Sequence, residues 1–143
     1  MIKNNAYIDM VGDLFHYGHV RNIENIYNLG YNVIVGIHSD EVVKSYKREP
    51  ILNMYERIEL IQSCKFISKV IQDAPLRITK DFIDTHKIDM VFHSHTEEEC
   101  GTYNKMYEIP ISLGKFIRSE YTSEISTTQI IKRILSRGEV NIK

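Results

Sequence analysis

The chain has little cysteine and no long apolar run. Cys64 lies in a helical pattern and Cys100 in an acidic segment, so the pair predicts neither a disulfide framework nor a paired-cysteine zinc motif. A reducing, cytoplasmic setting is therefore expected. The apolar runs span only a few residues, whereas a membrane-spanning helix needs about 20. The first five residues do not resemble a signal peptide.

The chain also lacks an excess of charge of either sign. Its 18 basic and 19 acidic residues give a formal net charge of −1. No overall field attracts nucleic acid or an anionic membrane, so neither is an expected partner. The length of 143 residues fits one domain over residues 1–143, and 43% apolar with 26% charged residues is ordinary for a globular protein.

Strand-like and helix-like segments alternate along the chain. Strands are expected at residues 6–11, 32–37, 66–71 and 89–93, with a late edge segment formed by 109–111 and 115–117. Helices are expected at residues 19–29, 53–64, 79–85, 101–107 and 126–136. This alternation predicts an α/β fold, a Rossmann-like doubly wound sheet of five parallel strands. Ligands of such sheets bind beyond the carboxyl ends of the strands, here near residues 11–19, 38–47 and 93–96.

The most informative motif lies between the first strand and the first helix, at His16-Tyr17-Gly18-His19. Residues three apart share a helical face, so both imidazoles are expected to point at one ligand. A helix N-terminus offers free N–H groups to an anion, and Gly18 lets a phosphate approach the backbone. The motif therefore indicates a polyphosphate site. A zinc site would need further ligands, for which only His93 and His95 are candidates.

The segment from Asp13 to His19 resembles the His-x-Gly-His signature of the nucleotidyltransferase superfamily. Further stretches resemble the cytidylyltransferases that act on phosphoethanolamine, phosphocholine and glycerol 3-phosphate. These stretches are residues 36–41, Lys47 before Pro50-Ile51, Glu56-Arg57, residues 64–71, and Ile125-Ser126-Thr127-Thr128. They occur in the family's order and extend over nearly the whole chain.

The resemblance implies transfer of CMP from CTP to a small phosphomonoester, with release of pyrophosphate and with Mg²⁺ accompanying CTP. It implies catalytic roles for His16, His19 and Lys47, and phosphate binding to the substrate by Lys47, Arg57 and Arg118. It implies nucleotide binding by Val11, Gly12, Asp13, Gly18, His93, Ile125, Ser126, Thr127 and Thr128. No metal site made by protein residues is expected. Related enzymes are dimers, which implies a homodimer.

The sequence departs from the family's pattern in three places. Met10 replaces a glycine, with Gly12 two residues later, and His93-Ser94-His95-Thr96 replaces a run that contains acidic residues. Before the last helix, Tyr121 replaces an arginine and Glu124 a glycine, which leaves Arg118 as the candidate cation. Two alternatives therefore stay open. One is a nucleotidyltransferase of other specificity, for glycerol 3-phosphate, another acceptor or ATP; the other is a non-catalytic nucleotide-binding module.

Overall fold

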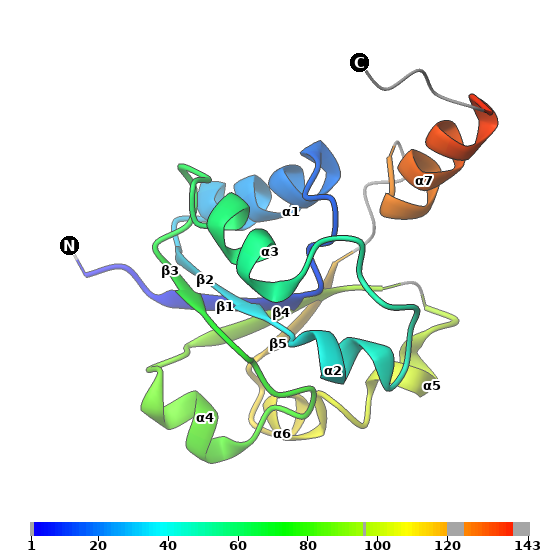
Figure 1. Cartoon of the computed structure of the whole chain (residues 1–143). Helices are drawn as coiled ribbons and strands as arrows, with labels where there is room; N and C mark the ends of the chain where they lie inside the picture. The colour runs from blue at the N-terminus through cyan, green and yellow to red at the C-terminus, as the bar shows by residue number, and fades with distance from the viewer. Residues whose placement is uncertain (1, 96, 120–124, 139–143) are drawn as a thin grey trace.

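Five parallel strands form the centre of the computed structural model (Figure 1), which describes residues 2–95, 97–119 and 125–138. The sheet has the order β3-β2-β1-β4-β5, and every neighbouring pair is parallel. Its strands are β1 (Asn5–Met10), β2 (Asn32–Ile37), β3 (Lys69–Ile71), β4 (Met90–Ser94) and β5 (Phe116–Ser119). The predicted doubly wound sheet of five parallel strands is confirmed.

Helices cover both faces of this sheet. Figure 1 shows α1 (Tyr17–Asn28) and α3 (Met54–Ile61) on one face, and α4 (Lys80–Thr85) and α6 (Glu108–Ser112) on the other. The face under α1 and α3 is packed with Ile8, Ile23, Val35 and Ile61, among others. The opposite face buries Tyr7, Ile34, Ile83 and Tyr107 with their neighbours. Both faces of β1 and β2 are therefore apolar, as buried parallel strands require.

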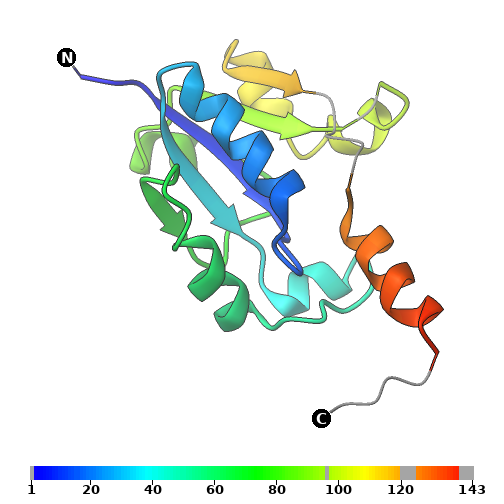
Figure 2. The same ribbon diagram turned by 90° about the horizontal axis from the view of Figure 1, so that it is seen from above.

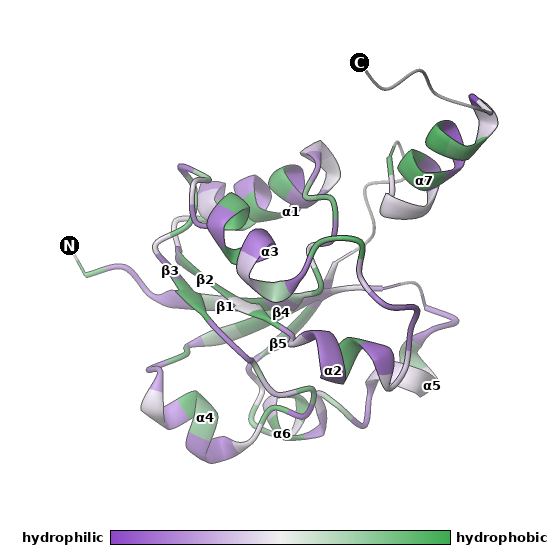
Figure 3. Ribbon diagram, in the orientation of Figure 1, coloured by the Kyte–Doolittle hydropathy of each residue, from purple (hydrophilic) through white to green (hydrophobic). Residues whose placement is uncertain are grey.

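The remaining helices lie beyond the ends of the strands. Figures 1 and 2 show α2 (Asp40–Lys44), α5 (Cys100–Tyr103) and α7 (Thr127–Ser136) around the end of the sheet at which the strands finish. Figure 3 shows hydrophobic and hydrophilic residues side by side on α7, and none of its residues is buried. No helix in the described ranges is long and apolar enough to cross a membrane.

One local prediction is wrong. Residues 109–111 were expected in an edge strand but lie in α6, where Pro110 occupies the first turn and needs no N–H partner. The segment 38–47, near which a ligand is expected to bind, contains α2, whose N-cap Ser39 accepts a hydrogen bond from the Val42 N–H at 3.2 Å. Both helices have five residues, too few for a clear apolar period.

Candidate active site

A pocket of about 790 Å³ opens where β1, β2 and β4 end, between the N-termini of α1 and α7. One end of the pocket is formed by the turn between β1 and α1 and by the N-termini of α1 and α7. The other end lies on the α4–α6 face and holds polar and aromatic residues from the strand ends, the helices and the loops. Its lining there comprises Asp9, His38, Tyr46, Leu76, His93, Tyr103, Met106 and Tyr107. The fold thus places the pocket where the topology of the sheet predicts a ligand.

His16 and His19 cap the first helix reciprocally. His16 is the N-cap residue, and its Nδ1 accepts a hydrogen bond from the Gly18 N–H at 3.1 Å. His19 is the third helical residue, and its Nδ1 accepts from the His16 N–H at 3.1 Å. The centroids of the two rings lie 3.9 Å apart. His19 lies within α1, whereas His16 lies just before its first residue. Since each Nδ1 is an acceptor, each neutral ring carries its proton on Nε2.

The surroundings of both rings favour this neutral form. Burial lowers the pKa of His19 to about 3, with smaller contributions from the charges of His16 and Lys47. Burial also lowers the pKa of His16. Both imidazoles are therefore uncharged near neutral pH and offer their Nε2–H groups as hydrogen-bond donors.

Gly18 is required by close packing. A Cβ at this position would lie 2.9 Å from His16 Cε1 and 3.0 Å from the Cγ2 of Ile125. Any side chain would push the His16 ring or Ile125 aside. The glycine between the two histidines thus lets the start of α1 pack against the segment that leads into α7.

The N-terminus of α7 closes the same end of the pocket. Ser126 is the N-cap and accepts from the Gln129 N–H at 3.1 Å. The Thr127 hydroxyl donates to the Asp13 carbonyl at 3.0 Å and lies 3.4 Å from His16 Nε2. A proton on His16 Nε2 fits this contact. The Thr127 oxygen can accept that proton while the Thr127 hydroxyl donates its own to the Asp13 carbonyl.

The Asp13 carboxylate organises a distant loop. Its two oxygens accept from the N–H groups of Ile51 and Leu52, both at 2.9 Å. Asp13 is buried and follows Gly12, whose φ of 68° favours glycine. The carboxylate therefore fixes the segment between α2 and α3.

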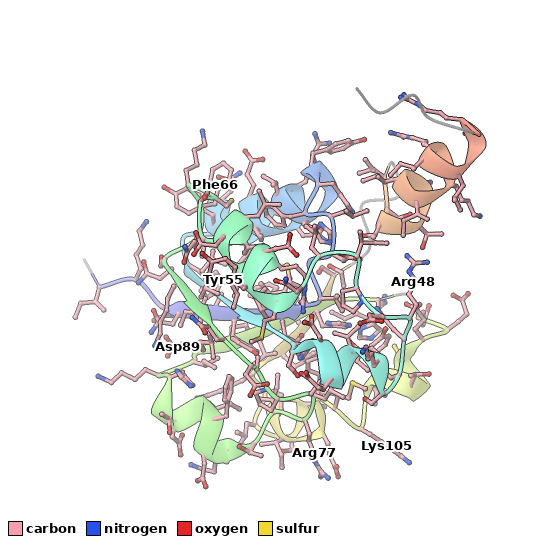
Figure 4. All side chains as sticks on the ribbon, viewed as in Figure 1. Arg48, Tyr55, Phe66, Arg77, Asp89 and Lys105 are labelled. Atoms are coloured by element: carbon pink, nitrogen blue, oxygen red, sulfur yellow. The ribbon has the colours of Figure 1, made fainter. Side chains whose placement is uncertain are left out.

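The loop fixed by Asp13 carries the cations of the pocket. Lys47 and Arg48 both line it, and Arg48 Nη2 donates to the Thr128 hydroxyl at 3.3 Å. Figure 4 shows Arg48 on this loop, on the side of the molecule that carries α7. Desolvation lowers the pKa of Lys47, while the charge of Glu99 opposes this shift. Arg48 was not among the predicted site residues, although it directly follows Lys47.

Two predicted phosphate-binding residues lie elsewhere. Arg57 is fully buried and donates to the carbonyls of Leu52 and Val11, at 3.1 and 2.6 Å, and to Asp40 at 2.7 Å. Arg118 donates to the His95 carbonyl at 3.1 Å. Neither arginine lines the pocket. The structure gives Arg57 a role in holding the first turn to α2 and α3, not one at the pocket surface.

Four residues form a group at the other end of the pocket, here called the Asp9 cluster: Asp9, His38, His93 and Tyr107. Three of them, Asp9, His38 and Tyr107, were not among the predicted site residues. The Tyr107 hydroxyl donates to Asp9 Oδ1 at 2.5 Å and lies 2.7 Å from His93 Nδ1. His38 Nε2 lies 3.5 Å from Asp9 Oδ2. His93 was predicted to bind nucleotide, and the structure places it in this cluster. The available signal was a carboxylate in a strand that is otherwise apolar.

Asp9 and His38 shift each other's protonation. Although burial alone would raise it, hydrogen bonds and charges from His38 and His93 lower the pKa of Asp9, which stays ionised. Burial alone would lower the pKa of His38, but Asp9 and the Ala74 carbonyl raise it. The cluster therefore holds a buried negative charge at the pocket wall.

Within the described residues, no group of three or more His, Cys, Asp or Glu side chains is arranged to hold a metal ion. Thr96, Tyr121 and Glu124, which depart from the family's pattern, lie outside the described residues. Two tyrosines that the motifs do not include, Tyr46 and Tyr103, also line the pocket. Tyr17 and Tyr55 are 47% and 71% exposed and do not line it.

Comparison with known proteins extends these observations. Residues 12–133 match the family described as "Cytidylyltransferase-like". The chain is 39% identical to choline-phosphate cytidylyltransferase 2 of Arabidopsis thaliana over 91% of this chain and 44% of that protein. It is 35% identical to ethanolamine-phosphate cytidylyltransferase of Dictyostelium discoideum over 90% of this chain and 37% of that protein. The chain thus spans about two fifths of the length of these relatives.

Solved structures support the fold. A lipopolysaccharide core biosynthesis protein of Thermoplasma volcanium aligns with a TM-score of 0.62 and 21% identity, over 82% of this chain and 98% of that chain. Pantothenate synthetase of Thermus thermophilus aligns with a TM-score of 0.60 and 9% identity, over 90% of this chain and 61% of that chain. At these identities the likeness shows the shared fold alone.

Proposed function

Because the chain belongs to the cytidylyltransferase-like family, we propose that it transfers CMP from CTP to a small phosphomonoester of the phosphoethanolamine or phosphocholine type. Pyrophosphate is the second product. The observation that carries the proposal is the reciprocal cap of His16 and His19, which presents two Nε2–H donors at a helix N-terminus. Such a constellation suits a chain of phosphates. The relatives' printed names, which specify choline-phosphate and ethanolamine-phosphate, support the acceptor class.

The reaction is an in-line displacement at the α-phosphate of CTP. An oxygen of the acceptor phosphate forms a bond to the α-phosphorus, and the bond from that phosphorus to the bridging oxygen of pyrophosphate breaks. No covalent enzyme intermediate is required. The protein must hold two anions together and stabilise the charge that grows on the leaving group.

Different residues of the pocket bind the triphosphate and hold the two anions together. The Nε2–H groups of His16 and His19 donate to the triphosphate, and the N-terminus of α7 adds backbone N–H groups and hydroxyls. Lys47 reaches both anions from the loop that Asp13 fixes, because its long side chain is not held in a salt bridge among the described residues. Arg48 supplies a second cation at the α7 end. Neutral histidines suit this role, because they donate to phosphate without proton exchange.

Magnesium enters as part of the MgCTP substrate. The Asp13 carboxylate is occupied by two backbone N–H groups, and the described residues form no metal cage. We expect oxygens of the triphosphate and water to hold the ion. A homodimer, from the family resemblance, and a cytoplasmic setting, from the two cysteines that form no disulfide framework, complete the proposal.

Pyrophosphate release tests the proposal. Purified protein is incubated with Mg²⁺, with CTP or ATP, and with a panel of phosphomonoesters. The expected result is release with CTP and one acceptor class, and a loss of at least about 100-fold in His19→Ala. Release with ATP alone would overturn the choice of nucleotide. Nucleotide binding without release for every pair would favour a non-catalytic nucleotide-binding module.

A further inference from the structure

Cys100 lies beside a buried histidine that directly follows β4. Its Sγ is 3.5 Å from His95 Nε2. Cys100 is the first residue of α5 and is half-buried, whereas His95 is only 1% exposed. His95 Nδ1 is buried and has no hydrogen-bond partner among the described residues. The proposed function uses neither side chain, so the pair and its unpaired nitrogen need an explanation of their own.

The neighbouring His93 indicates where His95 carries its proton. The 2.5 Å contact between Tyr107 and Asp9 assigns the hydroxyl proton to the carboxylate. His93 Nδ1, 2.7 Å from the Tyr107 oxygen, is then a donor, and His93 Nε2 is a buried acceptor without a partner among the described residues. The centroids of the His93 and His95 rings lie 5.1 Å apart. A proton on His95 Nδ1 places a donor near this acceptor, whereas a proton on His95 Nε2 would leave two buried acceptors unpaired, which is costly.

With its proton on Nδ1, His95 presents the lone pair of Nε2 to the thiol of Cys100. Burial lowers the pKa of His95, the charges of His93 and Arg118 lower it further, and the charge of Glu99 opposes the shift. The ring is therefore neutral near neutral pH, and its lone pair can take up a proton. A neutral imidazole in contact with a thiol is the arrangement in which a general base activates a sulfur nucleophile.

Aromatic and backbone contacts hold the His95 ring in this position. The ring stacks on Tyr103, with centroids 5.2 Å apart and an interplanar angle of 26°, and on Phe116, at 6.3 Å and 27°. The His95 N–H donates to the Ser119 carbonyl at 3.2 Å, and its carbonyl accepts from Arg118 at 3.1 Å. A nucleophile, a base within reach and groups that orient the base are the parts that such a site requires.

We propose that Cys100 is a thiol-modification site at which His95 acts as the base and a small disulfide is the reactant. The Cys100 sulfur attacks one sulfur of the disulfide, so that a new S–S bond forms and the old one breaks. The thiol proton passes to His95 Nε2 and from there to the departing thiolate. The products are a mixed disulfide on Cys100 and one small thiol, and an added thiol reductant reverses the exchange.

A group attached to Cys100 changes the wall of the pocket. Helix α5 ends at Tyr103, which lines the pocket and contacts the rings of both His93 and His95, with centroids 4.6 and 5.2 Å away. The charge of Glu99, the residue before Cys100, acts on Lys47. We therefore expect the mixed disulfide to displace Tyr103 and to change the surroundings of Lys47.

The rate of thiol modification tests the proposal without any turnover. The full chain is treated at pH 7 with dithiodipyridine, a neutral disulfide that the acidic residues 97–99 do not repel. Absorbance of the released thione gives the rate, and peptide mass spectrometry identifies the modified cysteine. We expect Cys100 to react at least about 10-fold faster than N-acetylcysteine, which has no neighbouring base. Cys64, which packs against the core, is the internal comparison.

Two variants assign the rate to the pair. Cys100→Ser keeps the size of the side chain and removes the thiol, so the fast reaction should disappear. His95→Gln keeps a polar side chain and removes the base, and we expect it to slow Cys100 by about 10- to 100-fold without changing Cys64. His86→Gln is the matched control, because this ring also contacts an aromatic residue, Phe82, but lies outside the pocket. It is expected to leave both rates unchanged.

The outcomes separate this inference from the proposed function. Fast labelling of Cys100 that depends on His95 would support the site even if no pair of substrates released pyrophosphate. Labelling no faster than that of N-acetylcysteine, or equally fast in His95→Gln, would overturn the site whatever the turnover. If His95→Gln fails to fold, the comparison with N-acetylcysteine decides.

Turnover then tests the effect on the pocket, and this arm alone rests on the proposed function. The mixed disulfide is expected to lower kcat/KM by about 10-fold or more, because small displacements in a site are costly to the rate. A thiol reductant should restore the rate, and Cys100→Ser should be insensitive to the disulfide. An unchanged kcat/KM in fully modified protein would overturn the link between Cys100 and the pocket.

Discussion

The Thr127 hydroxyl donates a hydrogen bond to the Asp13 carbonyl at 3.0 Å, although 114 positions separate the two residues. The same oxygen lies 3.4 Å from His16 Nε2. One side chain therefore joins the last helix, the first turn and a histidine of the pocket. No residue of α7 is buried. This bond, together with the hydrogen bond from Arg48 to Thr128, holds its N-terminus to the pocket.

Thr127→Val keeps the shape of the side chain and removes the hydroxyl. The Asp13 carbonyl loses its donor and His16 loses its orienting contact. We expect kcat/KM for CTP to fall by about 10- to 100-fold, equivalent to one to two lost hydrogen bonds in a buried site. The measurement is steady-state pyrophosphate release at varied CTP.

The matched control is Thr85→Val, an exposed threonine in α4, which is expected to leave kcat/KM unchanged. If both variants behave alike, the contact between Thr127 and Asp13 has no part in nucleotide binding.

The depressed pKa of His19 predicts how stability depends on pH. The folded value is about 3, whereas the ordinary value is 6.5. A histidine with a lowered folded pKa stabilises the protein fully above about pH 6.5, and this contribution is lost as the pH falls, because the unfolded chain takes up the proton first. We expect up to about 2.5 kcal/mol of loss between pH 6.5 and 4.5, at most about 1.4 kcal/mol per pH unit.

The variant His19→Gln isolates the contribution of His19 to the pH dependence of stability. Gln can accept the His16 N–H as Gln129 accepts the Ser126 N–H in α7, so the cap is kept while the titration is removed. The contribution of His38, whose pKa is raised, is the same in both proteins and cancels in their difference. Urea unfolding of both proteins at several pH values measures the difference. Parallel pH profiles would contradict the assigned protonation state.

Arg57 is expected to act through stability. Arg57→Met removes the donor to the Val11 and Leu52 carbonyls and leaves the Asp40 carboxylate without its cation. Breaking such a buried pair costs about 3–5 kcal/mol, measured as a shift of the urea midpoint. Arg77→Ala is the control, because the Arg77–Glu108 pair is exposed and contributes below about 1 kcal/mol.

Arg57→Lys separates this role from the phosphate-binding role predicted from the sequence. If Arg57 holds the fold, the lysine variant loses stability, since one ammonium cannot reach three partners. An unchanged urea midpoint with a raised KM for the acceptor would instead restore the predicted contact with substrate.

These two arginine roles illustrate what the sequence could and could not specify. The continuous apolar run at residues 32–37 predicted β2 with its observed bounds, because a buried parallel strand needs no alternation. The capping box of α3, formed by Asn53 and Glu56, is a local feature of the kind that a sequence can specify. The burial of Arg57 was not predictable from its helix, because two of its partners, Val11 and Asp40, are 46 and 17 positions away.

The site shows the same division. The motif around His16 and His19 is local, and it predicted a polyphosphate site at the start of α1. Asp9, His38 and Tyr107 lie on three separate elements, and only the sheet and α6 bring them together. The prediction of a strand at residues 109–111 failed for a related reason. Isoleucines on both sides of it favour a strand locally, whereas the packing of Tyr107 and Ile109 on the α4–α6 face selects a helix.

Tyr7 and Gly36 provide the last prediction. The Tyr7 hydroxyl is buried and has no hydrogen-bond partner among the described residues. Removing an unpaired buried hydroxyl avoids a desolvation cost, so Tyr7→Phe is expected to leave the free energy of unfolding unchanged or raise it by about 1 kcal/mol. A paired buried tyrosine would show the opposite sign.

Gly36→Ala is expected to lose about 1–3 kcal/mol or more, because overpacking a core forces neighbours out of place. A Cβ at this position would overlap the Tyr7 hydroxyl and lie 2.8 Å from the Ala74 Cβ. In the double variant Tyr7→Phe/Gly36→Ala the hydroxyl overlap is gone, but the contacts with the Tyr7 Cζ, at 2.7 Å, and with the Ala74 Cβ remain. Part of the loss should therefore return, with a coupling energy of about 1 kcal/mol in a double-mutant cycle. Additive effects would show that the Tyr7 hydroxyl takes no part in excluding a side chain from position 36.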